Sequence, residues 1–188
     1  TPTLVMVNGV DAMRQYNGTW STITGAITGV ATTDLVHVWQ HKKRLWFIES
    51  ATMSAWYLPV ISITGAATEF PLGNIFKKGG TLLFGATWSV DAGDGMDDTI
   101  IFVTDQGEIA VYQGTDPGSD FELSGVYEIG VPLGKNATFR AGGDIAILTV
   151  DGIVSVAAAM QTDKGGSAAQ AITMPIEPAW REAVQFRS

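Results

Sequence analysis

Residues 41–60 read HKKRLWFIESATMSAWYLPV, in which two apolar runs rich in aromatic residues flank a short polar break. Three other segments have the same pattern of four or five apolar residues, a polar or glycine-containing break and a second apolar run: LVMVNGVDAMRQY (4–16), IIFVTDQGEIAVY (100–112) and IAILTVDGIVSVA (145–157). Short apolar runs on both sides of a turn signal are typical of β-hairpins. The repetition therefore predicts four related hairpin units.

Turn residues stand at the centre of each hairpin. Tight hairpin turns require positive φ angles, which glycine adopts without strain. Three of the repeats supply such a glycine, in Asn8-Gly9, Gln106-Gly107 and Asp151-Gly152. The segment 45–57 has none, and we expect Ser50-Ala51-Thr52 to form a looser turn. The turn centres recur about every 40 to 55 residues, which is the range of propeller blades.

Further strands are predicted on either side of these hairpins. An additional apolar segment precedes three of them, at LVHVWQ (35–40), TLLFGATWSV (81–90) and ATFRAGG (137–143). Polar outer segments follow two of them, at NGTWSTITG (17–25) and GTDPGSDFELSGVYEIG (114–130). Three inner strands and a less regular outer strand make a four-stranded blade. The sequence therefore predicts an all-β fold of β-propeller-like blades of antiparallel strands, about four in number, complete or part of a larger ring.

The predicted domain organisation places the β-propeller blades in residues 1–160 and a connecting segment in 161–188. Inner strands of a blade have neighbouring blades on both faces and therefore read as continuous apolar runs. We expect the large side chains of Trp39, Trp46, Trp56 and Trp88 to fill the space between blades. The C-terminal segment has an Ala-rich stretch and a proline, Pro178, where a helix can begin, which predicts a short helix or loop there.

Composition excludes several classes of protein. The chain of 188 residues is 46% hydrophobic and 16% charged, which is not typical of a disordered chain. The net charge of -8 disfavours tight binding of nucleic acid, whose phosphates a binding protein must neutralise. The chain has no cysteine, which excludes disulfides and thiolate metal sites. No apolar run approaches the length of about 18 residues that a membrane span needs, so no membrane partner is expected.

The loop SVDAGDGMDD (89–98) is the main candidate for an ion site. Its carboxylates could suit a calcium ion, which prefers oxygen ligands, and the candidate ligands are Asp91, Asp94, Asp97 and Asp98. The spacing does not match an EF-hand. The run also resembles the Asp box of sialidase-type propellers, which is a structural turn. We favour a solvated loop between strands over a metal site, and we predict no cofactor.

Other motifs favour structural interpretations. His37 and His41 are the only histidines, and no third ligand accompanies them. We expect His37 in an inner strand and His41 in a turn. GVPLGKNAT (130–138) departs from the spacing of a phosphate-binding loop and is interpreted as a plain turn. No nucleophile elbow or cysteine nucleophile is present, and no catalytic residue is predicted.

Five segments of the chain resemble a family of virion proteins of tailed bacteriophages and prophages. They are NGVDAMRQYNGTWSTITG, VHVWQHKKRLWFIESATMSAWYLPV, GAATEFPLGNIFKKGG, LLFGATWSVDAGDGMDDTIIFVTDQGEIAVYQGTDP and VPLGKNATFRAGGDIAILTVDGIVSV, and the block 88–117 is the most specific. Members are long β-propeller-containing proteins of the tail or neck, some of them packaged-DNA stabilisation or tail-hub components. They continue beyond the position of Ser188 with further blade-like segments.

The resemblance implies a non-enzymatic structural protein, made in the cytoplasm of the host bacterium and located in the virion. Its expected partners are other tail or neck proteins, further copies of itself, or both. The alternative hypothesis is a carbohydrate-binding propeller that recognises a host surface through exposed Trp20, Trp56 or Trp180. The third hypothesis is a glycoside hydrolase, which would need an acidic pair about 5 to 9.5 Å apart in a cleft.

Overall fold

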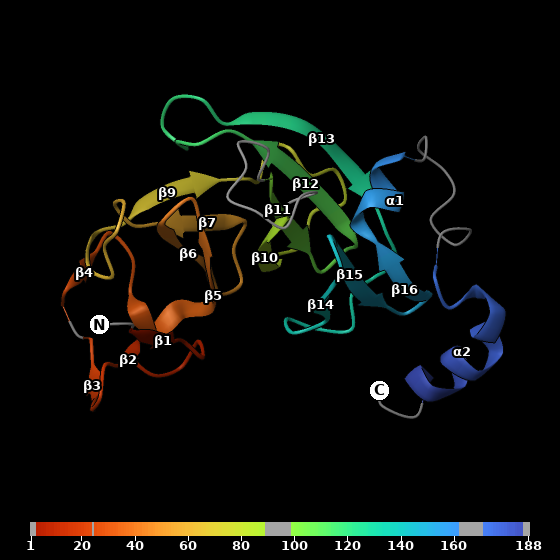
Figure 1. The fold of residues 1–188 in the computed structure, drawn as a ribbon, viewed down its shortest axis with the longest axis horizontal. Helices are drawn as coiled ribbons and strands as arrows, with labels where there is room; N and C mark the ends of the chain where they lie inside the picture. The colour runs from red at the N-terminus through yellow and green to blue at the C-terminus, as the bar shows by residue number, and fades with distance from the viewer. Residues whose placement is uncertain (1–2, 24, 89–98, 162–170, 186–188) are drawn as a thin grey trace.

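The structure is a computed structural model that describes residues 3–23, 25–88, 99–161 and 171–185. Strands dominate it, and four antiparallel sheets follow one another along the chain (Figure 1). Sheet 1 contains β1 (Leu4–Met6), β2 (Arg14–Tyr16) and β3 (Trp20–Thr22). Sheet 2 contains β5 (Leu35–His41), β6 (Arg44–Glu49), β7 (Ser54–Tyr57) and β9 (Thr68–Pro71). Sheet 3 contains β10 (Leu82–Trp88), β11 (Thr99–Thr104), β12 (Glu108–Gln113) and β13 (Glu122–Glu128). Sheet 4 contains β14 (Thr138–Ala141), β15 (Asp144–Thr149) and β16 (Gly152–Ser155).

Smaller elements connect and follow these sheets. The short strands β4 (Ile27–Thr28) and β8 (Gly65–Ala66) pair in parallel, and a 3-10 turn, η1 (Thr32–Asp34), precedes β5. The C-terminal part contains α1 (Val156–Gln161), η3 (Met174–Ile176) and α2 (Glu177–Gln185). The predicted all-β class and the short helices near the C-terminus are confirmed. Within the described ranges, no helix has both the length and the apolar character needed to cross a membrane.

The strand order explains how the sheets form. In every antiparallel sheet the strands pair in the order of the chain, so each sheet is a meander. The strands predicted around residues 35–40, 81–90 and 137–143 are the first strands of sheets 2, 3 and 4. The expected glycine turns are present at Gly107 and Gly152, which have positive φ angles. Gly9 also has a positive φ angle, but it lies in a longer connection between β1 and β2, so the tight turn expected there is wrong. Ala51 takes the same conformation without glycine, at φ 57°.

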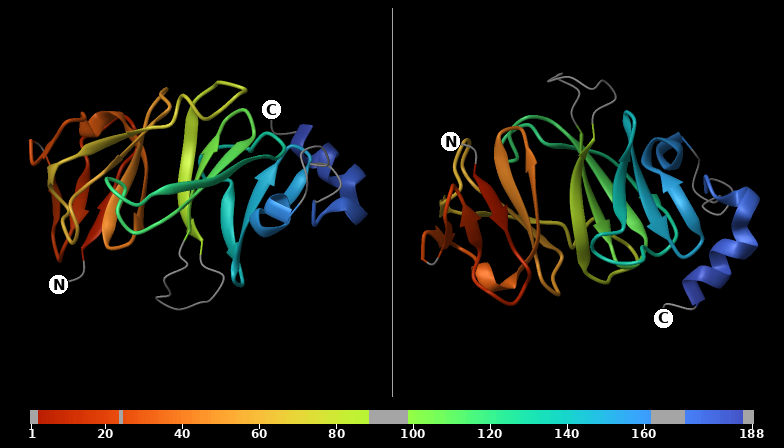
Figure 2. Two further views of the ribbon diagram at one scale, coloured as in Figure 1. Left: turned by 90° about the horizontal axis from the view of Figure 1, so that it is seen from above. Right: turned by 60° about the horizontal axis from the view of Figure 1, so that its bottom comes forward.

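The sheets lie in a row along the long axis of the molecule, and both further views agree (Figure 2). A hydrophobic cluster lies between each neighbouring pair. Met13, Ile23 and Phe47 belong to the cluster between sheets 1 and 2. Trp46 and Phe102 belong to that between sheets 2 and 3. The cluster between sheets 3 and 4 includes Ile101, Ile147 and residues of α1. Because each sheet leaves apolar side chains that the next sheet covers, the core is distributed over three interfaces.

The four tryptophans expected between neighbouring sheets all lie there. Trp46 is completely buried in the cluster between sheets 2 and 3, and Trp39 stacks on it with ring centroids 5.9 Å apart. Trp56 packs against the cluster between sheets 1 and 2, and Trp88 packs against that between sheets 3 and 4. Large rings therefore separate the sheets and fill the space between them.

Sheets 2 and 3 approach each other most closely where β5 crosses β10. An added Cβ at Gly85 of β10 would lie only 2.4 Å from two ring atoms of Trp39 in β5. His37 of β5 also bonds to the Gly85 carbonyl oxygen, at 2.9 Å from its Nε2. Gly85 does not have a positive φ angle, so its backbone conformation does not require glycine. Glycine is required because the Trp39 ring leaves no room for a side chain.

We expect Gly85→Ala to lower the free energy of unfolding by about 1 to 3 kcal/mol, because overpacking forces side chains and backbone to shift. Gly73→Ala is the matched control, since its added Cβ would meet only the Cβ of Met53 at 3.6 Å. This control should leave stability unchanged or slightly raised. Urea unfolding followed by tryptophan fluorescence measures the free energy of unfolding of both variants. Equal effects of the two substitutions would contradict the close approach.

Candidate interaction surface

The outward face of sheet 1 exposes a set of mainly apolar side chains. Directly opposed residues of an antiparallel pair project to the same face of the sheet. The strand register places Leu4 opposite Tyr16 and Tyr16 opposite Trp20, which forms one row. The second row is Met6, Arg14 and Thr22. All six residues are exposed, and we call them together the sheet-1 face.

Burial alternates along β1 and β2 of sheet 1, whereas all three residues of β3 are exposed. Val5 and Gln15, which oppose each other between the two rows, are half-buried. Val5 packs against the cluster between sheets 1 and 2. The inner side of the sheet is therefore covered by sheet 2, whereas Leu4 keeps 59% of its surface exposed and Trp20 keeps 45%.

Aromatic and cationic groups gather at one corner of the sheet-1 face. The ring centroids of Tyr16 and Trp20 lie 5.2 Å apart, with 46° between the ring planes. The guanidinium carbon of Arg14 lies 5.7 Å from the centroid of the Trp20 ring, within the range of a cation–π interaction. This corner offers flat apolar surface beside one positive charge, and none of the six side chains is a carboxylate.

Trp56 and Trp180, the other two tryptophans of the carbohydrate hypothesis, form hydrogen bonds within the protein. The indole nitrogen of Trp56 donates to Oε2 of Glu49 at 2.9 Å, and that of Trp180 donates to the carbonyl oxygen of Thr149 at 3.0 Å. Both side chains are half-buried. Of the three tryptophans in the carbohydrate hypothesis, Trp20 is the exposed one.

The histidines connect sheets 2 and 3. The expectation that His41 is a turn residue is wrong, because β5 continues through it and its side chain is buried. The strand continues because Lys42 and Lys43 form the turn, at φ 46° and 60°. His37 donates to Gly85, and Nδ1 of His41 lies 3.2 Å from the Thr87 hydroxyl. The two histidines thus bond side by side to β10.

The predicted calcium ligands lie outside the described residues. Asp91, Asp94, Asp97 and Asp98 all belong to the range 89–98, so that prediction stays untested. Within the ranges that the structure describes, no three side chains of His, Asp or Glu come together in a way that could hold a metal ion.

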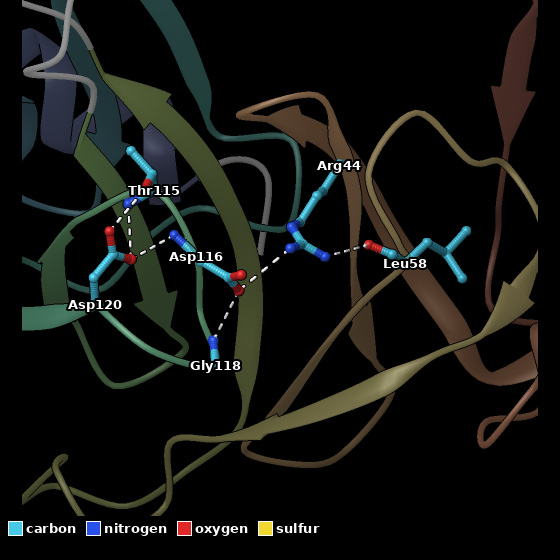
Figure 3. A network of polar contacts seen from close by, with 6 residues as sticks. All are labelled: Arg44, Leu58, Thr115, Asp116, Gly118 and Asp120. Carbon is cyan, nitrogen blue, oxygen red and sulfur yellow. Dashed lines mark hydrogen bonds and ion pairs between the residues drawn. The ribbon is translucent and has the colours of Figure 1, made fainter.

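A polar network fixes the loop 114–120 of sheet 3 against sheet 2 (Figure 3). The Asp120 carboxylate accepts hydrogen bonds from the hydroxyl and the backbone N–H of Thr115 and from the N–H of Asp116. The bond from the Thr115 hydroxyl, together with the backbone bonds, lowers the pKa of Asp120. Asp116 in turn pairs with Arg44 of β6 at 3.3 Å. The carboxylates of this loop therefore serve to position it.

Two further contacts hold Arg44 in place. Its guanidinium donates to the carbonyl oxygen of Leu58 at 3.4 Å and lies 5.5 Å from the centroid of the Tyr57 ring.

The carboxylate of Glu108 also has a structural role. It is buried and accepts hydrogen bonds from the backbone N–H groups of Lys77 and Lys78. The sequence does not reveal the pairing of Asp116 with Arg44 or of Glu108 with the backbone of Lys77 and Lys78, because many residues separate each acid from its donor.

Comparison of the chain with protein-family models, with curated proteins and with solved structures found no match.

The stability of the interface between sheets 2 and 3 should fall at mildly acidic pH. Burial lowers the pKa of His37 below its ordinary value of 6.5, and Lys135 adds to this, against the opposing effect of the bond to Gly85. Between the lowered pKa and 6.5 the unfolded chain binds more protons than the folded chain. The free energy of unfolding should therefore decrease as pH falls below 6.5.

Urea unfolding at about pH 7.5 and about pH 5.5 measures this loss. His37→Gln is the matched variant, since its amide can still donate to the Gly85 carbonyl oxygen but does not titrate. The wild-type chain should lose more stability than the variant between the two pH values. An identical loss in both proteins would contradict a role for His37.

Proposed function

We propose that the chain is a non-enzymatic structural component of a phage or prophage tail or neck, where it acts as an assembly scaffold through protein–protein contacts. The sheet-1 face carries this proposal. It exposes Leu4, Met6, Tyr16 and Trp20 together on one side of a sheet. Contiguous exposed apolar patches on soluble proteins mark interaction sites.

The arrangement of the sheets supports an architecture of propeller-like blades. Four meander sheets follow one another in chain order, and each neighbouring pair encloses an apolar cluster. Blades of a propeller are stacked in the same manner and cover each other's faces. We infer that sheets 1 to 4 are such blades, in an open row to which further sheets can be added.

The phage setting is supported by the resemblance of five segments of the chain to tailed-phage virion proteins. The acidic character of the chain is compatible with this setting. A net charge of -8 repels phosphate, so that a protein beside the path of DNA would not retain it. These two points suggest where the scaffold acts, whereas the sheet-1 face suggests how it makes contacts.

The proposal predicts that the protein is part of assembled particles. Particles induced from the source strain can be purified and imaged by electron microscopy, with gold-labelled antibody against the chain. We expect label at the tail or the neck. As a control, the same antibody should not label particles from a deletion strain. Absence of the protein from every purified particle would contradict the proposal.

Carbohydrate binding is a second candidate function, because Tyr16 and Trp20 form an exposed aromatic pair beside Arg14. Aromatic rings can stack on the apolar faces of sugars. On a glycan array, Trp20→Ala should abolish any specific binding, and Trp180→Ala should retain it, since that side chain is half-buried. A lack of binding by the wild-type chain, or equal binding by both variants, would reject this function.

A further inference from the structure

We propose that Asn17 is a site of spontaneous deamidation, at which the exposed turn between β2 and β3 acquires a carboxylate, and that Asn8 is protected from the same reaction. The reaction needs no enzyme, metal or partner, so the inference does not depend on the proposed function. Three observations lead to it: the residue that follows each asparagine, the hydrogen bonds of each side-chain amide, and the space around each following glycine.

The chemistry of deamidation favours asparagine followed by glycine. The backbone nitrogen of the following residue loses its proton and attacks Cγ of the asparagine side chain, and the bond from Cγ to the amide nitrogen breaks. That nitrogen takes up a proton and leaves as ammonia. Water then opens the resulting five-membered imide at one of its two carbonyl carbons, which yields aspartate or isoaspartate. A following glycine leaves the attacking nitrogen unhindered, because it has no Cβ.

Two of the four asparagines of the chain precede glycine. Asn8-Gly9 lies in the connection between β1 and β2, and Asn17-Gly18 lies in the turn between β2 and β3. The other two are followed by isoleucine and alanine, whose Cβ atoms hinder the attack. Asn8 and Asn17 are both exposed, so water reaches both. Local structure must therefore decide between them.

Three hydrogen bonds hold the amide of Asn8. Its Oδ1 accepts the N–H groups of Val10 at 3.0 Å and of Asp11 at 2.8 Å, and its Nδ2 donates to the Asp11 carboxylate at 2.8 Å. Attack turns the flat amide into a tetrahedral carbon and draws it to the Gly9 nitrogen, which disturbs these bonds. The Asp11 carboxylate also opposes the negative charge that the attack places on Oδ1.

The backbone beside Asn8 is closely packed as well. Gly9 is half-buried, and a Cβ added to it would lie 2.5 Å from Cγ1 of Val36 in β5. Ring closure brings Cγ of Asn8 and the Gly9 nitrogen together and rearranges the backbone on both sides of that nitrogen. Because Gly9 cannot shift toward Val36, this rearrangement is restricted, and we expect slow deamidation at Asn8.

The amide of Asn17 is held by no such contacts. Within the part of the chain that the structure describes, its side chain forms no hydrogen bond or ion pair. Gly18 is exposed, and a Cβ added to it would meet no described atom within 4 Å. Its φ angle of 111° is one that glycine adopts without strain. The Asn17 amide can therefore reach the Gly18 nitrogen without losing a contact.

Deamidation at Asn17 changes the sheet-1 face in both charge and shape. The turn joins Tyr16 and Trp20, which pair across β2 and β3 and whose ring centroids lie 5.2 Å apart. The product places a carboxylate beside a face that has none among its six side chains. Isoaspartate also adds a carbon atom to the backbone of this short turn. Ageing should therefore alter the contacts that the face makes, a consequence that does rest on the proposed function.

Mass spectrometry of tryptic peptides measures the two reactions separately, because cleavage after Arg14 places Asn8 and Asn17 in different peptides. The folded chain is incubated at mildly alkaline pH and then digested briefly at mildly acidic pH, which stops the reaction. Asn17 should deamidate at least about 10-fold faster than Asn8, because the loss of a few ordinary hydrogen bonds slows a reaction by a factor of this order. In urea, where the local structure is lost, the two rates should become similar.

Asp11→Ala tests what protects Asn8. The variant loses the carboxylate that accepts from Nδ2 of Asn8, so deamidation at Asn8 should become about 3-fold faster or more. The Asn17 peptide of the same sample is the control, and its rate should not change. Asn17→Asp supplies the aspartate product as a standard, and circular dichroism checks that each variant is folded.

Two results would overturn the inference: an Asn17 that deamidates no faster than Asn8 in the folded chain, or one that reacts only in urea. An Asn8 rate that Asp11→Ala leaves unchanged would overturn the role of that hydrogen bond. These rates are measured on the isolated chain. They are therefore separable from the proposed function, which fails only if the protein is absent from particles.

Discussion

The close packing of Trp39 on Gly85 is the contact on which the arrangement of the sheets depends. Because Gly85 has no side chain, β10 can approach β5 until the indole of Trp39 covers the backbone. Trp39 also stacks on Trp46, its direct partner across β5 and β6, and Trp46 lies parallel to Phe121 at a centroid distance of 5.7 Å. The apolar cluster between sheets 2 and 3 is built around these rings, and burial of such rings supplies much of the stabilisation.

Polar contacts around this cluster fix how the two sheets are aligned. His37 and His41 bond to Gly85 and Thr87 of β10, and Arg44 holds the loop 114–120 through Asp116. Partly exposed ion pairs of this kind contribute little to stability. Their effect is directional, since a hydrogen bond between two particular strands is satisfied at one alignment only. Burial of the aromatic rings therefore holds sheets 2 and 3 together, and the polar contacts determine how the two sheets are aligned.

A row of sheets built in this way has two end faces, and their apolar side chains link the fold to the proposed function. Each internal face is covered by a neighbouring sheet, while the C-terminal segment covers part of sheet 4. The outward face of sheet 1 is rich in apolar side chains and remains exposed. A stack that leaves such a face exposed can accept a further sheet on it.

The sequence by itself determined most strands of the four meander sheets, the glycine turns at Gly107 and Gly152 and the tryptophans between sheets, because apolar runs and glycine turns are local properties. It also indicated the row of repeated hairpins, although sheet 1 is joined by a longer connection in which Asn8 accepts the N–H groups of Val10 and Asp11. Tertiary structure alone decided that His41 is buried and that Trp20 is exposed while Trp56 and Trp180 are half-buried. Exposure depends on which distant segments cover a side chain, and the residues next to it in the sequence do not specify those segments.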